Sequence, residues 1–558
     1  MKLDLVIDAL ASDLSRSLAG LAPEIVLITT IVLLLLVRLF PGSTRYHMGG
    51  LALVGTMAAL LLSLIQLINL EMPSVLDSTP AGPLLRLVRT SPEKAVHDDP
   101  VDLFAGPAPQ PDTAQTTQPV RRNGMLRFDS FTVFFRLFLL TFAALVIWLT
   151  GLTGIPDNED SPDFYTLLLG ATLGMLLMVS ANHLLMVLIA VEMASLPSYG
   201  MAGFLKGRRE ASEASLKYVV FGAGASGIML YGISLLVGKY GTAHLPSLGA
   251  EIAKGGGPVG GVLLLGLMLV LVGIAFKLSA VPFHFWCPDV FEGAAAEVAA
   301  FLSVASKGAA LGLLARLTTS LILPRHPPIE IYLGGVIALL AAITATFGNL
   351  AAYAQTNLKR LLAFSTIAHA GYMMMPLAAF VPLSRQPDAA GQSALESLTF
   401  YLLIYLFMNL GAFAVVALIR NQIRSEDLKD YGGLIRRCPF LTVAMAVFLL
   451  SLTGIPPLAG FAAKFRIFAV LYEANLHWLL VIGLANTVFS LFYYVKVLRV
   501  MILDEPPPNA PAWTVPAGAI VFCTVLIAAN LVVMLVPGAW DAMDSLVQLA
   551  VPHLLGSF

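Results

Sequence analysis

Charged side chains are scarce in this chain of 558 residues. Asp, Glu, Lys and Arg make up 12% of it and hydrophobic residues 58%, whereas a soluble domain has about 25% charged residues. The formal net charge of -1 gives no indication of a basic face for nucleic acid or of an acidic tail. The scarcity of charge therefore excludes a soluble globular domain and a nucleic-acid-binding protein, and indicates a membrane protein.

Cysteine is also rare. Cys287, Cys438 and Cys523 lie far apart, with no C-x-x-C pair and no cluster of other ligands beside them. Iron–sulfur clusters and zinc sites need several such ligands close together. We therefore expect this chain to bind no cofactor and no metal, and to take no part in electron transfer. The first 18 residues carry acids among apolar residues and no small-residue cleavage site, so we expect mature sequence there and not a signal peptide.

Long apolar runs dominate the sequence instead. They lie near 20–40, 47–70, 125–153, 162–180, 182–204, 214–238, 259–289, 290–322, 329–352, 357–382, 396–419, 440–473, 476–502 and 512–537. Each run approaches or exceeds the ~20 residues with which a helix crosses a bilayer, and all are continuous, unlike the short alternating segments of a membrane barrel. The sequence therefore predicts an all-α polytopic membrane protein with about fourteen transmembrane helices.

Lysine and arginine are shared unevenly between the gaps that separate these runs. The odd-numbered gaps hold Arg45, Lys206, Arg208, Arg209, Lys359, Arg360, Arg420, Arg424, Lys429, Arg436, Arg437, Lys496 and Arg499. The short even-numbered gaps hold only Lys239, Lys254, Arg325 and Arg385. The positive-inside rule then places both termini outside. The long gap 71–124, rich in Pro, Asp, Thr and Gln, is expected to form an extended outer loop.

Two runs are too long for simple spans and contain prolines. The seventh has Pro282 and Pro288, and the twelfth has Pro456 and Pro457. Because proline lacks an N–H group and clashes with the preceding turn, both helices should break and leave carbonyls free at membrane depth. The breaks lie five helices apart, which favours two inverted repeats over two unrelated proline kinks. The predicted divisions are two N-terminal helices in 1–70, the loop 71–124, a third helix in 125–161, a first repeat (helices 4–8) in 162–322, a second repeat (helices 9–13) in 329–502, and a C-terminal helix and tail in 503–558.

The ionisable groups inside the runs are the candidate functional residues. They are Glu192 in helix 5, Lys217 in helix 6, Lys277 before the break of helix 7 and His284 after it, Lys307 in helix 8, His369 in helix 10, and Lys464 after the break of helix 12. An ionisable group at the centre of a span costs at least about 2.5–3.5 kcal/mol, so it needs a partner, water or a function. Burial and neighbouring charges shift the protonation of such groups. A row of them can therefore act as coupled, switchable proton sites.

Each residue also has a structural interpretation. Glu192 could serve only as the partner of Lys217, whose long side chain can reach towards it, and Lys217 could extend to the inner surface. His284 and His369 could be packing histidines as well as proton relays. Lys277, Lys307 and Lys464 lie at mid-span, where neither an acidic partner nor a membrane surface is expected within reach.

Six segments carry a family resemblance that extends over about residues 20–500. They read VEMASLPSY, EASLKYVVFGAGASGIMLYG, FKLSAVPFHFWCPDVFEG, FLSVASKGAALGLLARL, QTNLKRLLAFSTIAHAGYMMM and GIPPLAGFAAKF. In this order they resemble the subunit N family of the proton-pumping NADH:quinone oxidoreductase, complex I. In that family a helix 5 glutamate and lysines of helices 6, 7, 8 and 12 form the proton path. The resemblance implies this role for Glu192, Lys217, Lys277, Lys307 and Lys464.

The resemblance also implies a division of labour. NADH oxidation and quinone reduction, with FMN and iron–sulfur clusters, are expected in partner subunits. This chain would convert their signal into proton transfer beside neighbouring antiporter-like subunits, in the inner membrane of a bacterium. Glu24 also fits the family's first helix. Two features depart from the family: residues 293–297 read GAAAE where a Gly-Ala-Pro-Thr-Pro type of segment is expected, and the loop 71–124 is longer than the family needs.

Two other classes of protein would share this composition. A stand-alone or Mrp-type cation/proton antiporter subunit would bury the same charges, but this sequence lacks carboxylate pairs suited to binding sodium. A structural membrane scaffold would be equally apolar, and it would have no reason to bury three lysines at mid-span. The isolation of the chain with or without partner proteins would distinguish these classes.

Overall fold

The structure is a computed structural model that describes residues 18–40, 47–71, 124–255, 260–386, 390–507 and 513–551. Its α-helices are α2 Ala22–Arg38, α3 Gly49–Glu71, α6 Ser130–Thr153, α7 Ser161–Ser180, α8 Leu184–Ala202, α9 Arg209–Tyr240, α10 Leu245–Lys254, α11 Gly261–Leu278, α12 Trp286–Gly293, α13 Ala296–Phe301, α14 Lys307–Ile322, α15 Pro327–Ala352, α16 Leu358–Leu383, α17 Ala390–Ile423, α18 Leu434–Arg437, α19 Pro439–Thr453, α20 Ala459–Glu473, α21 His477–Leu503, α22 Ala517–Leu535 and α23 Ala539–Ala550. Pairing between extended segments is limited, in these ranges, to isolated β-bridges. The prediction of an all-α polytopic membrane protein is confirmed.

Twelve helices in the described ranges are long and apolar enough to cross a membrane. The predicted total of about fourteen spans would also need α2, which has 17 residues, and the pair α19 and α20, which have 15 residues each. These helices are shorter than the ~20 residues of a simple span. The fourteen-span count therefore stays a prediction, and most of the expected loop 71–124 lies outside the described residues.

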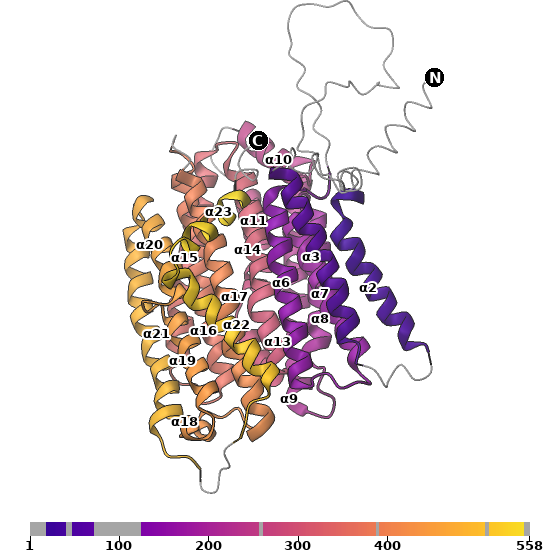
Figure 1. The fold of residues 1–558 in the computed structure, drawn as a ribbon. Coiled ribbons are helices and arrows are strands. Elements are labelled where there is room, and N and C mark those ends of the chain that lie inside the picture. Colours follow the sequence, from indigo (N-terminus) through magenta and orange to yellow (C-terminus); the bar gives the residue numbers. More distant parts are fainter. Residues whose placement is uncertain are drawn as a thin grey trace, which may run out of the picture.

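The helices form a bundle whose centre is occupied by the middle of the chain. The N-terminal helices α2 and α3 lie on one side and α20 and α21 on the other, while α22 runs obliquely past α17 and α6 (Figure 1). All residues of the apolar 18-residue stretch of α16 are buried inside the protein, and the same is true of the span 296–322. In α9 and α21 only 33% of the corresponding stretch is buried. The central helices therefore offer the site that is best shielded from lipid.

Two helical segments are interrupted where the prolines predicted a break. Helix α11 ends at Leu278 and α12 begins at Trp286, while α19 ends at Thr453 and α20 begins at Ala459. Gly460 lets α20 approach the end of α19 closely, because a Cβ atom there would lie 1.8 Å from the carbonyl oxygen of Ser451. Each interruption leaves backbone groups without the partner that a continuous helix would supply.

Candidate functional site

Lys307 lies at the interruption between α11 and α12. Its side chain is 1% exposed, and a π-helix, Leu302–Ser306, immediately precedes it. The Nζ atom donates a hydrogen bond to the carbonyl oxygen of Leu278 at 3.0 Å and another to Oγ of Ser279 at 2.8 Å. Single π turns inside helices are frequent at functional sites. A buried amine is thus bound to the backbone at the end of a broken helix.

Proline explains why this carbonyl is free to accept the bond. In a continuous helix the Leu278 carbonyl would accept from the N–H group four residues later. That residue is Pro282, which has no N–H group. The amine of Lys307 takes the place of the missing donor, so the break and the buried lysine stabilise each other.

Lys464 makes the same kind of contact at the second interruption. It is 3% exposed, and its Nζ donates to the carbonyl oxygen of Thr453 at 2.9 Å. Thr453 is the last residue of α19 and stands four residues before Pro457. Gly454 has a φ of +87° and its Cβ position would lie 2.9 Å from the Lys464 side chain, so glycine leaves room for the lysine to cross. By these contacts the counterpart of Lys464 at the first interruption is Lys307.

Lys277 occupies the last turn of α11 and is 1% exposed. Its Nζ donates to Oγ of Ser195 in α8 at 2.9 Å. Ser195 stands one turn after Glu192 in α8. The contact therefore joins Lys277 of α11 to the helix that carries Glu192.

An aromatic pair lies between Lys277 and Lys307. The Lys277 amine is 5.9 Å from the ring centroid of Tyr218, and the Lys307 amine is 6.0 Å from that of Trp286. These two rings stack with their centroids 4.3 Å apart. Lys277 and Lys307 thus contact one continuous aromatic surface.

Lys217 does not pair with Glu192, and this expectation was wrong. Its Nζ lies 2.6 Å from a carboxylate oxygen of Asp289 and 2.8 Å from one of Glu213, and its side chain is 37% exposed. Glu192 instead accepts a hydrogen bond from Ser226. The reason is that Lys217 lies near the start of α9, where Glu213, one turn earlier, and the acid of α12 are closer than the middle of α8.

The acid bound to Lys217 belongs to a larger ionic cluster. Arg360, near the start of α16, lies 2.7 Å from Asp289 and 2.7 Å from Glu292. Lys217, Asp289, Arg360 and Glu292 therefore connect α9, α12 and α16. The cluster joins the two predicted repeats at one end of the bundle.

His369 stands in a group of tyrosines next to Lys464. Its Nδ1 atom is 2.6 Å from the hydroxyl oxygen of Tyr401, and its ring lies 5.2 Å from that of Tyr405. The Lys464 amine is 4.6 Å from the ring centroid of Tyr372, which in turn lies 5.9 Å from the histidine ring. His369 is thus placed to exchange hydrogen bonds in the interior, close to the second interruption.

His284 has a different environment. Its ring packs against Phe285 and Phe347 at 4.5 and 4.4 Å, and its Nδ1 atom has no hydrogen-bond partner among the described residues. These contacts are those of a packing histidine. Its role in a proton path stays a prediction.

A cavity of about 320 Å³ lies beside Pro456 and Pro457. Its other lining residues, among them Leu450 and Leu531, are apolar except for Thr442, and Lys464 does not line it. This cavity is therefore not a hydrated pocket at Lys464. The free carbonyls that the sequence predicts at this break favour water beside Lys464, and such a hydrated pocket stays a prediction.

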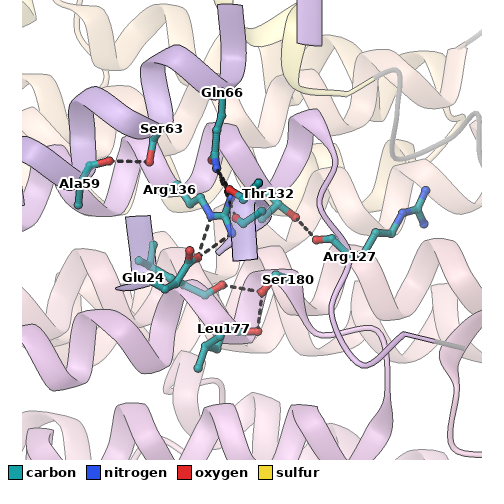
Figure 2. Close-up of polar contacts among 12 residues, drawn as sticks. Glu24, Ala59, Ser63, Gln66, Arg127, Thr132, Arg136, Leu177 and Ser180 are labelled. Atoms are coloured by element: carbon teal, nitrogen blue, oxygen red, sulfur yellow. Dashed lines mark hydrogen bonds and ion pairs between the residues drawn. The ribbon is translucent and has the colours of Figure 1, made fainter. Parts of the chain in front are cut away.

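Two buried ion pairs escaped the sequence interpretation. Figure 2 shows Arg136 of α6 between Glu24 of α2 and Gln66 of α3, and its guanidinium donates to them at 2.8 and 2.9 Å. Arg316 of α14 binds both oxygens of Asp129 at 2.9 and 3.0 Å. The sequence did contain a signal for these pairs, because both arginines interrupt apolar runs in the same way as the buried lysines. The bidentate and multiple contacts of these pairs indicate that they fasten α2, α3, α6 and α14 together.

No group of three or more His, Cys, Asp or Glu side chains in the described part of the chain is placed to hold a metal ion. The three cysteines are buried as free thiols. The side chains that the contacts above bring together are amines, carboxylates, an imidazole and phenols, all of which can exchange protons.

Comparison with known proteins gives a consistent result. Residues 181–490 match the model of the family described as "NADH:quinone oxidoreductase/Mrp antiporter, TM". NADH-quinone oxidoreductase subunit N of Anaeromyxobacter sp. is 42% identical over 75% of this chain and 82% of its own length. NAD(P)H-quinone oxidoreductase subunit 2 of Gloeobacter violaceus is 41% identical over 71% of this chain and 74% of its own length.

Solved structures share the fold. A chain of respiratory complex I from Thermus thermophilus with bound aureothin is 30% identical and superimposes with a TM-score of 0.68, covering 92% of this chain and 97% of that one. A chain of the Mrp complex from Dietzia sp. has a TM-score of 0.73 over 97% of both chains, with 19% identity. The second likeness concerns the fold alone.

Proposed function

This chain belongs to the NADH:quinone oxidoreductase/Mrp antiporter transmembrane family, and from that membership we propose that it is the proton-translocating subunit N of a complex I. It couples quinone reduction in other subunits to proton transfer through its buried ionisable groups. It holds no complete active site for the redox reaction. The alternative is a stand-alone or Mrp-type cation/proton antiporter subunit, which the Mrp fold likeness keeps in view.

The observation that carries the proposal is the pair of lysine–carbonyl contacts at the two interruptions. Lys307 and Lys464 are buried among apolar helices, and each binds a carbonyl oxygen with its amine. A carbonyl accepts a hydrogen bond from either a neutral amine or an ammonium group, because both have N–H donors. The contact therefore holds the lysine in place while its proton count changes, as a transfer site requires.

The proposed path follows the order of the buried groups through the bundle. It runs from Glu192 and Lys277 in the first repeat to Lys307 and then, by way of His369, to Lys464. Lys217 acts at the edge of this path through its ionic cluster, and His284 contributes at the first interruption. An aromatic ring lies beside the amine of each of the three buried lysines Lys277, Lys307 and Lys464.

Partners and location follow from the same membership. NADH, FMN, iron–sulfur clusters and quinone are handled by partner subunits, and neighbouring antiporter-like subunits lie beside this chain. The complex sits in the inner membrane of a bacterium with both termini of this chain on the outer side. A common side for the two termini is supported by the position of α2, which begins at the end of the bundle where α23 lies (Figure 1).

Purification tests the proposal against its alternative. Isolated in mild detergent, the chain should be recovered together with the NADH-oxidising and quinone-reducing subunits. After reconstitution, addition of NADH and quinone should drive protons into or out of the vesicles. Recovery of this chain alone as an active cation/proton exchanger, with no NADH-dependent proton movement, would favour the antiporter.

A double-mutant cycle tests the position of Lys217. Because Lys217 contacts Asp289, the effects of Lys217→Ala and Asp289→Ala on proton pumping should be non-additive. The interaction free energy from the double-mutant cycle should be at least about 0.5 kcal/mol. Lys217→Ala and Glu192→Gln should add to within about 0.5 kcal/mol, as expected for residues without a shared contact. Proton pumping per NADH oxidised is the measurement.

The control for this cycle is the Lys254–Glu251 pair, whose exposed side chains on α10 lie outside the path. Lys254→Ala should leave pumping unchanged. Strong coupling between Glu192 and Lys217, with none between Lys217 and Asp289, would contradict the arrangement described above.

A further inference from the structure

Glu297 is a buried acid outside the proposed path. It lies in the first turn of α13 and is 1% exposed. Neither of its carboxylate oxygens has a hydrogen-bond partner among the described residues. An ionised carboxylate is costly to bury unless a cation or water stabilises it, and otherwise it takes up a proton and becomes neutral. Glu297 is therefore an acid whose protonation is not fixed by an ion pair within the described structure.

A charged cluster lies on one side of Glu297. Lys359, 2% exposed at the start of α16, contacts the backbone three residues before it. The Lys359 amine donates to the carbonyl oxygen of Ala294 at 2.6 Å and lies 2.9 Å from Glu426, which also lies 3.1 Å from Arg420. This cluster connects the segment that carries Glu297 to the end of the bundle where α16 begins.

Polar groups continue on the other side, towards Lys307. The two residues are ten positions apart on one helical span, or about 15 Å. Asn409 of α17 donates to Oγ of Ser303 at 2.5 Å, in the π-helix between them. The side-chain oxygen of Asn409 and Oγ of Ser306 have no partner among the described residues. Buried polar atoms of this kind are where ordered water binds, so this segment can support a chain of hydrogen bonds.

We propose that Glu297 is a further proton-carrying residue that delivers protons to Lys307 from the end of the bundle where α16 begins; this inference rests on the proposed function. The O–H bond of the Glu297 carboxylic acid breaks, and a proton passes along the hydrogen-bonded groups. An N–H bond forms on the neutral amine of Lys307, which becomes an ammonium group. The carboxylate left behind is stabilised by Lys359 and is protonated again from the same end of the bundle.

A purely structural role for Glu297 makes a different demand on the side chain. The first turn of a helix has free N–H groups and a dipole that favours negative charge. An anchor of this kind needs an acceptor oxygen of the right length, and it needs no exchange of protons. Glutamine satisfies the anchor and fails as a proton carrier.

The test measures NADH-driven proton pumping in the reconstituted, assembled complex. Glu297→Gln keeps the size and one acceptor oxygen of the side chain, and we expect it to lower pumping per NADH oxidised at least about tenfold. Glu297→Asp restores the acid and should recover most of the pumping. Glu330→Gln is the matched control, because Glu330 is also 1% exposed in the first turn of a helix, α15, where it pairs with Arg385 at 2.6 Å. Its pumping should equal that of wild type.

Lys307→Ala, measured in the same preparation, distinguishes a failure of the role proposed for Glu297 from a failure of the proposed function. If Lys307→Ala loses pumping and Glu297→Gln pumps like wild type, the role of Glu297 is overturned and the proposed function stands. If Lys307→Ala also pumps like wild type, the proposed function itself fails.

Infrared difference spectra provide a second readout if Glu297→Gln does not assemble. Between the oxidised and the NADH-reduced complex, a carboxylic acid that exchanges its proton changes its C=O stretching band. We expect such a band in wild type to shift in frequency in Glu297→Asp. Identical bands in the two proteins would overturn the proposal.

Discussion

Replacing Lys307 by alanine should lower proton pumping per NADH oxidised at least about tenfold while the complex still assembles. The change removes the amine that binds the Leu278 carbonyl and Ser279 at the first interruption. Among the described residues, no other group outside α11 donates a hydrogen bond to that carbonyl, so the transfer site itself disappears. Lys277→Ala, at the neighbouring buried amine, should act in the same direction. The measurement is acidification of sealed vesicles that contain equal amounts of assembled complex.

Lys307→Arg distinguishes proton exchange from simple packing. Arginine keeps a positive charge and N–H donors, but its guanidinium cannot be deprotonated at any relevant pH. Pumping should therefore stay low in this variant even if stability recovers. The exposed Lys254→Ala variant supplies the control for a lysine outside the path. Wild-type pumping in an assembled Lys307→Ala complex would refute the role of this lysine.

Changing Pro456 and Pro457 together to alanine should lower pumping severalfold although no titratable group is altered. Alanine at 457 restores an N–H group at the position that pairs with the Thr453 carbonyl in a continuous helix. This backbone bond would displace the amine of Lys464, which now holds that carbonyl at 2.9 Å. The helix should then close across the interruption and leave Lys464 without its partner. Hydrogen exchange at residues 453–459 should slow, and pumping should fall with it.

The control for the proline variant is Pro376→Ala. Pro376 lies inside α16, which continues through it without interruption. Its replacement should therefore leave pumping per assembled complex unchanged. If the double proline variant affects only assembly or stability, and its assembled fraction pumps like wild type, then the prolines serve only to shape the helix for packing.

Some features of the site could be recognised from the sequence because they depend on local chemistry. An apolar run of about 20 residues must form a helix in lipid, since every backbone group has to be bonded internally. A lysine or glutamate inside such a run stands out for the same reason, and so do Arg136 and Arg316, which the sequence interpretation passed over. The family resemblance extended this reading to residues whose burial alone had left alternatives open.

The contacts of the charged groups could not be derived in this way. Lys217 and Asp289 are 72 positions apart, and the distance between them depends on how α9 and α12 pack. From the sequence, Glu192 on the preceding helix was one partner that Lys217 could reach, yet neighbouring helices in the chain can present any face to each other. A helix that is apolar on all sides carries no pattern that specifies its rotation.

The sequence by itself determined that this chain is a helical membrane protein, which runs are helices, and where proline removes a backbone donor. These properties follow from residues within one or a few turns of each other. Only the tertiary structure decided that Lys307 and Lys464 replace the donors missing at Pro282 and Pro457, and that Glu297 lies buried between the Ala294 carbonyl, which Lys359 binds, and the π-helix. The physical reason is that these contacts join different helices, and packing in three dimensions selects which of many polar groups meet.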